Sequence, residues 1–363
     1  MEIAVLGGGH GCYASVAEFT ERGHTVRWWR RDDAQHELIR QAGGLTVRDY
    51  RGTRKLPTGL LTADLAEAVC GAQLVVVPLP ATVHESLAEP LAKVLQDGQV
   101  VFLPPGTFGG FILASALHRH RPGARVRFAE TGTLPYLARK HGPAEVVISG
   151  YATRLPTGVF PARDATGALQ VLGEAYSSIE PCGDLLSAAL MNAGPVIHPP
   201  LILMNAGPLE HFDAWDIHNE GTQPSIRRTT DALDEERIAL RESLGYGSPH
   251  FPLRDHYATD GDEWMYGRSA HERLTDSGDW REHIDLCKHR YMLEDVAIGL
   301  SFFCSVARWR GVPMRIGEGM LAIGSAIVGR DLYAGGRSLE RLGLHRLSRE
   351  AFQKLMLVGF ADG

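Results

Sequence analysis

A run of glycines directly after the first apolar segment restricts the fold of this chain more than any other feature. Ile3–Leu6 predicts a buried strand, the segment GGGHGC over residues 7–12 predicts a turn, and the residues up to Gly23 predict a helix. Such a turn brings the backbone close to an anion, to which the helix N-terminus offers free N–H groups. The unit therefore predicts a pyrophosphate-binding turn, in which Cys12 replaces the third glycine of the usual pattern. We expect five residues of the turn to contact a dinucleotide: Gly7, Gly9, His10, Gly11 and Cys12.

Further apolar runs of strand length recur along the first half of the chain, at residues 25–29, 74–77, 100–103 and 126–129. Continuous apolar runs are typical of strands buried on both faces, and alternation of strands with helix-like segments favours a parallel sheet. The prediction is an α/β Rossmann domain with a doubly wound, mainly parallel sheet over residues 1–183. Val146–Val159 predicts a hairpin that is added to this sheet.

The pattern changes after about Asp184, where longer helical periodicities replace the short apolar runs. The predicted helices cover Asp184–Ala193, Pro199–Phe212, Pro224–Leu244, Ile284–Trp309 and Pro313–Gly329. They indicate an all-α domain over residues 184–363. Within it, residues 246–283 form a polar stretch that is rich in Gly, Pro, Asp and aromatic residues. This stretch predicts either an active-site lid or a long surface connection.

The composition restricts the class of protein. The formal net charge of −6 offers no basic field to nucleic acid, and the five cysteines are dispersed without a CxxC pair. No cationic and apolar leader opens the chain, and its longest apolar stretch, Val296–Ala307, is too short to span a bilayer. We therefore expect a cytoplasmic protein with reduced thiols and with neither a nucleic-acid nor a membrane partner.

The end of the second predicted strand bears on the choice of cofactor. NAD sites usually carry a carboxylate there, which binds the ribose hydroxyls. This chain has Arg30 and Arg31, whose guanidinium groups suit the 2′-phosphate of NADP, followed by Asp32. The pattern favours NADP(H) over NAD(H). The alternative is that both arginines are solvated and that Asp32 binds the ribose.

Two later strand ends are expected to face the same cleft, because ligands of such sheets bind outside the carboxyl ends of the strands. The candidate cofactor contacts at these ends are Pro80, Pro105 and Gly106, and Glu130 is a further candidate. As isolated segments, loops of this kind are more often plain turns.

Several segments of the second half, in a fixed order, are more specific. They are Met191–Pro200, Leu203–Gly207, Glu220–Ile226, Asp234–Ala239, Arg290–Val296 and Gly336–Leu344. Together with the N-terminal glycine turn and Pro105–Gly110, they resemble the opine dehydrogenase family, which includes octopine, nopaline and N-(1-D-carboxyethyl)-L-norvaline dehydrogenases. The resemblance extends over nearly the whole chain.

The resemblance implies a reaction in which an α-keto acid condenses with an amino acid or amine and NAD(P)H reduces the resulting imine. It implies that His198 and Asp295 form the catalytic pair and that Arg290 binds the keto-acid carboxylate. Thr222 and Gln223 are expected to contact the substrate. The chemistry is coherent, because a histidine that titrates near neutral pH can both give and accept a proton, and a carboxylate fixes its tautomer.

Two departures from the family pattern leave the substrate open. Gln223 stands where relatives often have Thr, and Gly194 stands where they often have Asn. A reductase of a preformed or cyclic imine, or of a ketone, on the same scaffold is therefore the second hypothesis, and an inactive nucleotide-binding relative is the third. No metal is expected, since the histidines lack partners at ligand spacing. The apolar C-terminal helices offer a surface for a homodimer.

Overall fold

The structure is a computed structural model that describes residues 1–258, 260 and 264–361. It divides into two compact units, each of which is described by itself. The first contains Met1–Leu79, Val83–Ala189 and the residues from Lys354 onward. The second contains Pro80–Thr82 and Leu190–Gln353.

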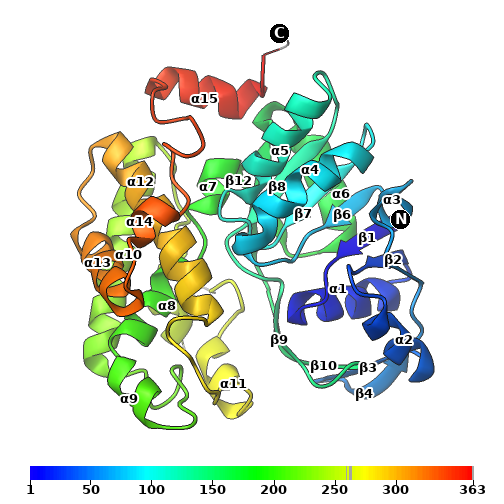
Figure 1. Ribbon diagram of the computed structural model, residues 1–363, viewed down its shortest axis with the longest axis horizontal. Helices are drawn as coiled ribbons and strands as arrows, with labels where there is room; N and C mark the ends of the chain where they lie inside the picture. The colour runs from blue at the N-terminus through cyan, green and yellow to red at the C-terminus, as the bar shows by residue number, and fades with distance from the viewer. Residues whose placement is uncertain (259, 261–263, 362–363) are drawn as a thin grey trace. The chain divides into compact units, whose positions relative to one another are not determined.

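An eight-stranded sheet with the order β12-β11-β8-β7-β6-β1-β2-β5 organises the first unit (Figure 1). The strands are β1 (Glu2–Leu6), β2 (Thr25–Trp29), β5 (Leu60–Thr62), β6 (Leu74–Val76), β7 (Val100–Leu103), β8 (Arg127–Thr131), β11 (Leu155–Phe160) and β12 (Ile179–Asp184). All neighbouring strands are parallel except β11 and β8, which are antiparallel. Every residue of β6 and β7 is buried, as the continuous apolar runs predicted. The mainly parallel Rossmann-type sheet is confirmed.

A second, four-stranded sheet with the order β4-β3-β10-β9 was not indicated by the sequence pattern. Its strands are β3 (Leu45–Asp49), β4 (Gly52–Leu56), β9 (Tyr136–Lys140) and β10 (Glu145–Tyr151). The hairpin predicted over Val146–Val159 is wrong, because β10 pairs with β3 and β9, whereas β11 pairs with β8 and β12. Side-chain periodicity reports which faces of a strand are buried, but it does not report the partner strand.

The helices of the first unit are α1 (His10–Glu21), α2 (Ala34–Gln41), α3 (Leu65–Val69), α4 (His84–Val94), α5 (Gly109–His120), η2 (Ala162–Asp164), α6 (Ala165–Ala175) and α7 (Leu185–Ala189), while η1 (Ala81–Val83) has its first two residues in the second unit. Helix α1 packs against β1 and β2 of the large sheet and against β9 and β10 of the small one (Figure 1). Its residues Tyr13, Val16 and Phe19 are fully or almost fully buried in the core. The helix that follows the glycine turn is therefore fixed by both sheets.

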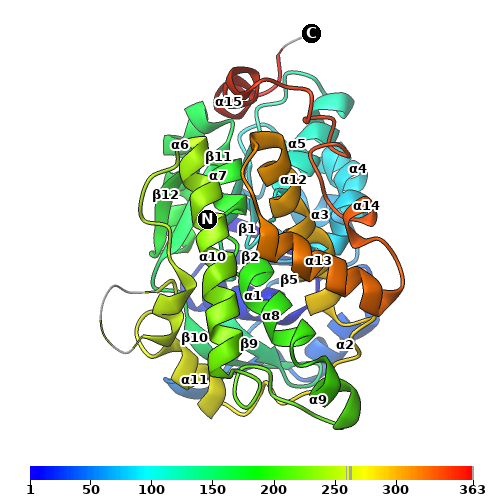
Figure 2. The same ribbon diagram turned by 90° about the vertical axis from the view of Figure 1, so that its left-hand side faces the viewer.

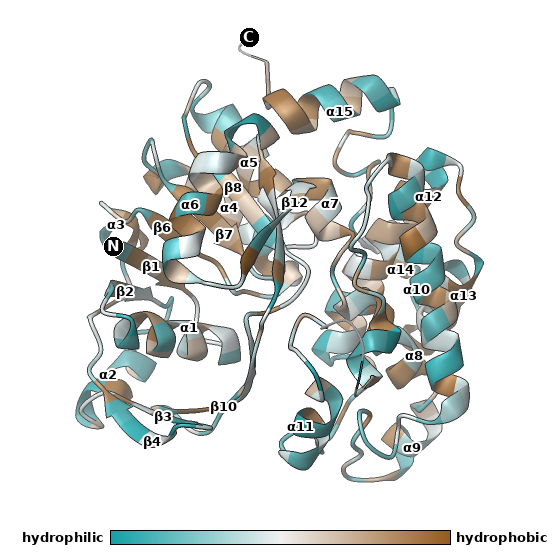
Figure 3. Ribbon diagram, turned by 180° about the vertical axis from the view of Figure 1, so that it is seen from behind, coloured by the Kyte–Doolittle hydropathy of each residue, from teal (hydrophilic) through white to brown (hydrophobic). Residues whose placement is uncertain are grey.

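The second unit is helical, as predicted. Its helices are α8 (Gly194–Leu203), α9 (Ala206–His211), α10 (Pro224–Leu244), η3 (Leu253–Tyr257), α11 (Ala270–Asp276), η4 (Tyr291–Leu300), α12 (Ser301–Arg310), α13 (Arg315–Val328) and α14 (Leu332–Gly335), and α15 (Arg349–Val358) follows. Helices α8, α10, α12 and α13 lie side by side (Figure 2). In Figure 3, α8 is mostly apolar and α10 mostly polar, because α8 is buried along nearly its whole length whereas α10 has an exposed face.

Helix α8 begins earlier than the sequence predicted. Proline favours the first helical position, so we expected a helix to start at Pro199. In the structure the helix starts at Gly194 with Pro195 as its second residue, and His198 consequently lies inside the helix. The stretch Leu185–Leu203 is apolar and long enough to cross a membrane by composition and length alone, but 83% of it is buried inside the protein, as in a core helix.

Helix η4 also differs from its prediction. It begins at Tyr291, later than the expected start at Ile284, and it is a π-helix over all ten of its residues. It carries Glu294 and Asp295. Wide helical turns of this kind are rare and frequently mark functional sites.

Candidate active site

The glycine turn has the backbone geometry that the sequence predicted. Gly7 has a φ of +119°, which side-chain-bearing residues rarely adopt. Its N–H donates to the carbonyl of Trp29 at 2.8 Å, and its carbonyl accepts from the indole of Trp28 at 2.6 Å. A Cβ added at Gly9 would meet nothing within 4 Å, and no side chain caps the helix that follows. The turn is therefore rigidly held and leaves space and backbone donors at the start of α1.

The remaining residues of the turn have distinct surroundings. Cys12 is fully buried and its thiol lies 3.5 Å from the carbonyl of Leu6, so it fills the place of the third glycine as a packing residue. Burial raises the pKa of its thiol to about 12. His10 accepts a hydrogen bond from the backbone N–H of Lys140 at 2.8 Å. A Cβ at Gly11 would press on the side chain of Leu134.

The two arginines that follow β2 are not equivalent. Arg30 lies over Gly8, where an added Cβ would overlap its guanidinium group, and it donates to the hydroxyl of Tyr13 at 3.2 Å. Arg31 is exposed. Asp32 accepts a hydrogen bond from the N–H of Ala34 at 2.9 Å and so belongs to the turn that starts α2. Of the three, Arg30 faces the glycine turn.

Glu130 at the end of β8 organises the loop that follows β7. Its carboxylate accepts hydrogen bonds from the N–H groups of Phe108, at 2.8 Å, and Gly110. A Cβ at Gly106 would overlap this carboxylate. Glu130 is fully buried. These contacts give Glu130 a role in shaping the loop that contains Pro105 and Gly106, and its contact with the cofactor stays a prediction.

In the second unit, His198 and Asp295 come together although 97 residues separate them. Nδ1 of His198 lies 2.8 Å from Oδ2 of Asp295. Two glycines permit this approach of α8 and η4, because a Cβ at Gly194 would overlap Oδ1 of Asp295, and a Cβ at Gly299 would overlap the ring of Pro195. The pair therefore depends on close helix packing, which only small residues allow.

Aromatic and charged side chains surround this pair. Tyr291 stacks on the imidazole of His198 with a centroid separation of 4.1 Å and an interplanar angle of 25°. The guanidinium of Arg290 lies 5.0 Å from the Tyr291 ring, and the ring of His218 lies 5.9 Å from that of His198. Burial raises the pKa of Asp295 to about 7, while the charge of Arg290 opposes that rise. Burial therefore favours the protonated form of the Asp295 carboxyl group more than water would.

Glu294, next to Asp295, bonds to the short segment Pro80–Thr82 of the same unit. Its carboxylate accepts a hydrogen bond from the N–H of Ala81 at 2.8 Å, and the buried Arg337 donates to the carbonyl of Ala81 at 3.0 Å. Burial, followed by the charge of Asp295, raises the pKa of Glu294 to about 7. Both backbone groups of Ala81 are thus bound by charged side chains.

Thr222 and Gln223 bond locally. The Thr222 hydroxyl donates to the carbonyl of Ile217 at 2.9 Å, and the Gln223 amide donates to the carbonyl of Glu220 at 2.8 Å. Their contact with a substrate stays a prediction. In the stretch 246–283 the structure describes η3 and α11, while residues 259 and 261–263 lie outside the described residues. The lid hypothesis likewise stays a prediction.

Sequence reasoning missed several neighbours of these sites. Tyr291 and Glu294 lie in the same segment as Arg290 and Asp295, so their nearness in the sequence to these two residues was the available signal. His218 and Lys140 lie in segments that carry no motif, and only the tertiary structure places them near the imidazole of His198 and near Tyr13.

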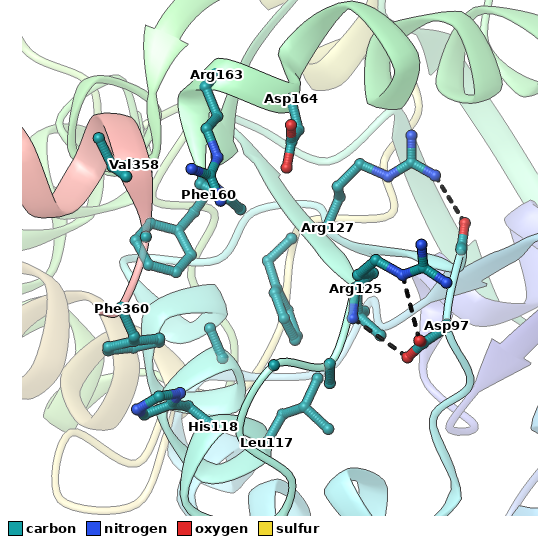
Figure 4. Close-up of a pocket in the computed structure, with 18 of the residues that line it drawn as sticks. Asp97, Leu117, His118, Arg125, Arg127, Phe160, Arg163, Asp164, Val358 and Phe360 are labelled. Atoms are coloured by element: carbon teal, nitrogen blue, oxygen red, sulfur yellow. Dashed lines mark hydrogen bonds and ion pairs between the residues drawn. The ribbon is translucent and has the colours of Figure 1, made fainter. Parts of the chain in front are cut away.

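A hollow of about 970 Å³ lies beside the amino ends of β7 and β8, which is the end of these strands away from their carboxyl ends (Figure 4). The rings of Phe160, Phe360 and His118 line one side, and Arg125 and Arg127 line the other. Cofactors of doubly wound sheets bind at the carboxyl ends of the strands. We therefore do not assign the dinucleotide to this hollow, despite its volume.

The chain matches two described protein families. Residues 181–328 match the family described as NAD/NADP octopine/nopaline dehydrogenase, alpha-helical domain. Residues 2–107 match the family described as NAD-dependent glycerol-3-phosphate dehydrogenase N-terminus. The first match includes His198 and Asp295, and the second includes the glycine turn.

Two curated proteins are similar over most of their length. Opine dehydrogenase from Arthrobacter sp. (strain 1C) is 27% identical over 354 residues, which cover 95% of this chain and 96% of that protein. Vitopine synthase from Allorhizobium ampelinum is 24% identical over 302 residues, which cover 82% and 80% respectively.

Two solved structures share the fold. Octopine dehydrogenase in complex with NADH and agmatine aligns with a TM-score of 0.74 at 20% identity, covering 99% of this chain and 98% of that one. Yersinopine dehydrogenase with bound NADP⁺ aligns with a TM-score of 0.66 at 16% identity, covering 98% and 97% respectively.

Proposed function

This chain belongs to the opine dehydrogenase family and is an NAD(P)-dependent oxidoreductase acting on CH–NH bonds. From that premise we propose that His198 and Asp295 are its acid–base pair. The reaction is an opine-type reductive condensation: an amine adds to the carbonyl of an α-keto acid, water leaves, and the imine is reduced to a secondary amine. The observation that carries the assignment of the pair is the 2.8 Å contact of His198 with Asp295 beside Arg290.

The glycine turn of the first unit fits the pyrophosphate of the cofactor. The space over Gly9 and the uncapped start of α1 give a dinucleotide room and backbone donors. Gly7, Gly9, His10 and Gly11 would hold the pyrophosphate there, with Cys12 packed behind them. When bound, the reduced nicotinamide supplies the hydride for the imine carbon.

We favour NADP(H) over NAD(H) because a guanidinium group faces the turn while the only carboxylate in the segment Arg30–Asp32 is engaged elsewhere. Arg30 lies over Gly8, whereas Asp32 bonds to the start of α2. A 2′-phosphate pairs well with a guanidinium group and poorly with a carboxylate.

The dyad moves protons at one atom of the imidazole. Asp295 holds Nδ1 of His198, which leaves Nε2 for the substrate, and stacking on Tyr291 fixes the plane of the ring. His198 first accepts a proton from the substrate ammonium and then donates one to the hydroxyl that leaves as water. The carboxylate stabilises the imidazolium between these two steps.

Arg290 is suited to bind the keto-acid carboxylate. It lies on the same segment as Asp295, and its charge acts on that carboxyl group, so an acid bound to it would lie near the dyad. A fixed carboxylate orients the neighbouring carbonyl for attack and for hydride transfer. Arg290→Lys keeps the charge but loses the bidentate geometry, so it should raise the KM of the keto acid more than it lowers kcat.

The direct experiment is a screen of NADPH and NADH oxidation with amino acids and with amines, including arginine and agmatine. Each is offered together with pyruvate, 2-oxoglutarate or glyoxylate, and product masses are read. A mass equal to the secondary amine supports the condensation. Oxidation by a cyclic imine or a ketone alone would favour the reductase alternative, and no oxidation with any pair would contradict catalysis altogether.

A further inference from the structure

Two positive side chains from distant parts of the first unit flank the same tyrosine. The guanidinium carbon of Arg30 lies 6.0 Å from the centre of the Tyr13 ring, and the ammonium of Lys140 lies 4.8 Å from it. Tyr13 is itself immobilised, because its hydroxyl donates to the carbonyl of Pro143 at 2.7 Å and its ring packs edge-on against Trp28. The positions of both cations are thus tied to the core of the unit.

Lys140 is also connected to the glycine turn. Its backbone N–H donates to Nδ1 of His10 at 2.8 Å, at the first residue of α1. Lys140 ends β9, a strand of the small sheet that packs on α1. The small sheet therefore brings a charge from far along the chain to the same turn that Arg30 covers.

No carboxylate compensates these two charges among the residues that the structure describes. Asp32 accepts from the N–H of Ala34, and Asp33 pairs with Arg40 at 3.3 Å. Glu18 of α1 pairs with Arg22 at 2.9 Å. Burial, and then the charge of Arg30, lower the pKa of Lys140. Two like charges held in this way repel each other, and a bound anion would remove that cost.

We propose that Lys140 and Arg30 together bind the 2′-phosphate of NADP(H) and that Arg31 does not take part. This inference rests on the proposed preference for NADP(H). A phosphate dianion suits two separate donors, one bidentate guanidinium and one compact ammonium. The site lies beside Gly8 and the end of β2, where the adenosine ribose of a dinucleotide binds in this type of sheet. Arg31 is left out because, among the described residues, the contacts with Tyr13 and Gly8 are made by Arg30 and none by the exposed Arg31.

The test measures binding without turnover. Dissociation constants of adenosine 2′,5′-bisphosphate and of 5′-AMP are determined by calorimetry for the wild-type protein and for Lys140→Met, Lys140→Arg, Arg30→Met and Arg31→Met. Lys140→Met and Arg30→Met should each weaken the bisphosphate about tenfold or more and change 5′-AMP less than about twofold. Lys140→Arg should restore most of the affinity. Arg31→Met is the matched control and should change neither ligand.

The outcomes separate this inference from the proposal on which it rests. If the wild-type protein binds the bisphosphate no more tightly than 5′-AMP, the preference for NADP(H) fails. If the wild type prefers the bisphosphate and Lys140→Met keeps that preference, the role of Lys140 fails while the proposed preference stands. Equal weakening of both ligands would also overturn the inference, because it would assign Lys140 to the phosphate that they share.

Discussion

The glycine turn of the first unit and the His198–Asp295 pair of the second unit are built in opposite ways. The turn is one continuous segment, and its geometry follows from local rules, namely a positive φ at Gly7 and the start of a helix at His10. The pair joins two helices that are far apart in the chain, and it exists because Gly194 and Gly299 let those helices approach. Changes in the pair should therefore alter turnover, and changes in the turn should alter cofactor affinity.

The largest expected effect is at His198. His198→Ala should lower kcat by about a hundredfold or more, because general acid–base help of this kind contributes roughly 10²–10⁴-fold. The dissociation constant of NADPH, measured by nicotinamide fluorescence, should not change. His120→Ala, an exposed histidine at the end of α5, is the control and should behave as wild type. Near-wild-type turnover of His198→Ala would remove the pair from the mechanism.

The pH dependence should follow the shared proton of the pair. Since burial raises the pKa of Asp295 to about 7, the pair holds its proton below that pH and loses it above. The condensation begins when His198 accepts a proton from the substrate ammonium, so the reductive reaction needs the deprotonated pair and its kcat/KM should fall about tenfold per pH unit below pH 7. A profile of kcat/KM that does not change between pH 5 and 8 would contradict this assignment of the pair.

A smaller effect is expected at Gly194. The Cβ of Gly194→Ala would displace the carboxylate of Asp295, so kcat should fall about tenfold and the free energy of unfolding by about 1–3 kcal/mol, with NADPH affinity unchanged. Gly319→Ala on α13 is the control, since a Cβ there meets nothing within 4 Å. That variant should be slightly more stable, because alanine favours helices over glycine. Equal kinetics in the two variants would show that the helix approach does not set the rate.

The smallest effect is expected at Glu294. This residue lies next to Asp295 of the catalytic pair, but it bonds to Ala81, which lies beside a predicted cofactor contact. Glu294→Ala removes the acceptor for the Ala81 N–H and should raise the KM of NADPH about threefold, because Pro80 is a predicted cofactor contact. Glu294→Gln keeps an acceptor oxygen and should restore the KM. If both variants leave the KM unchanged, the segment Pro80–Thr82 has no part in cofactor binding.

The fold was largely predictable because it depends on signals that sequence carries directly. The strands at residues 25–29 and 100–103 agree with β2 and β7, since continuous apolar runs reflect burial on both faces. The small sheet was missed because β3 and β4 have several half-buried or exposed residues and thus no apolar run. The π-helical geometry of η4 was missed as well, because its apolar pattern resembles that of an ordinary core helix.

By itself the sequence determined the strand, turn and helix around Gly7–Cys12 and the change from alternating strands and helices to helices alone. It also determined that His198 and Asp295 lie in recognisable segments. These features depend on neighbouring residues, whose spacing the chain fixes covalently. Only the tertiary structure decided that His198 contacts Asp295 and that Lys140 joins Arg30 at Tyr13. Such contacts depend on which helices and sheets pack together, and packing is set by the volume and shape of side chains throughout the core.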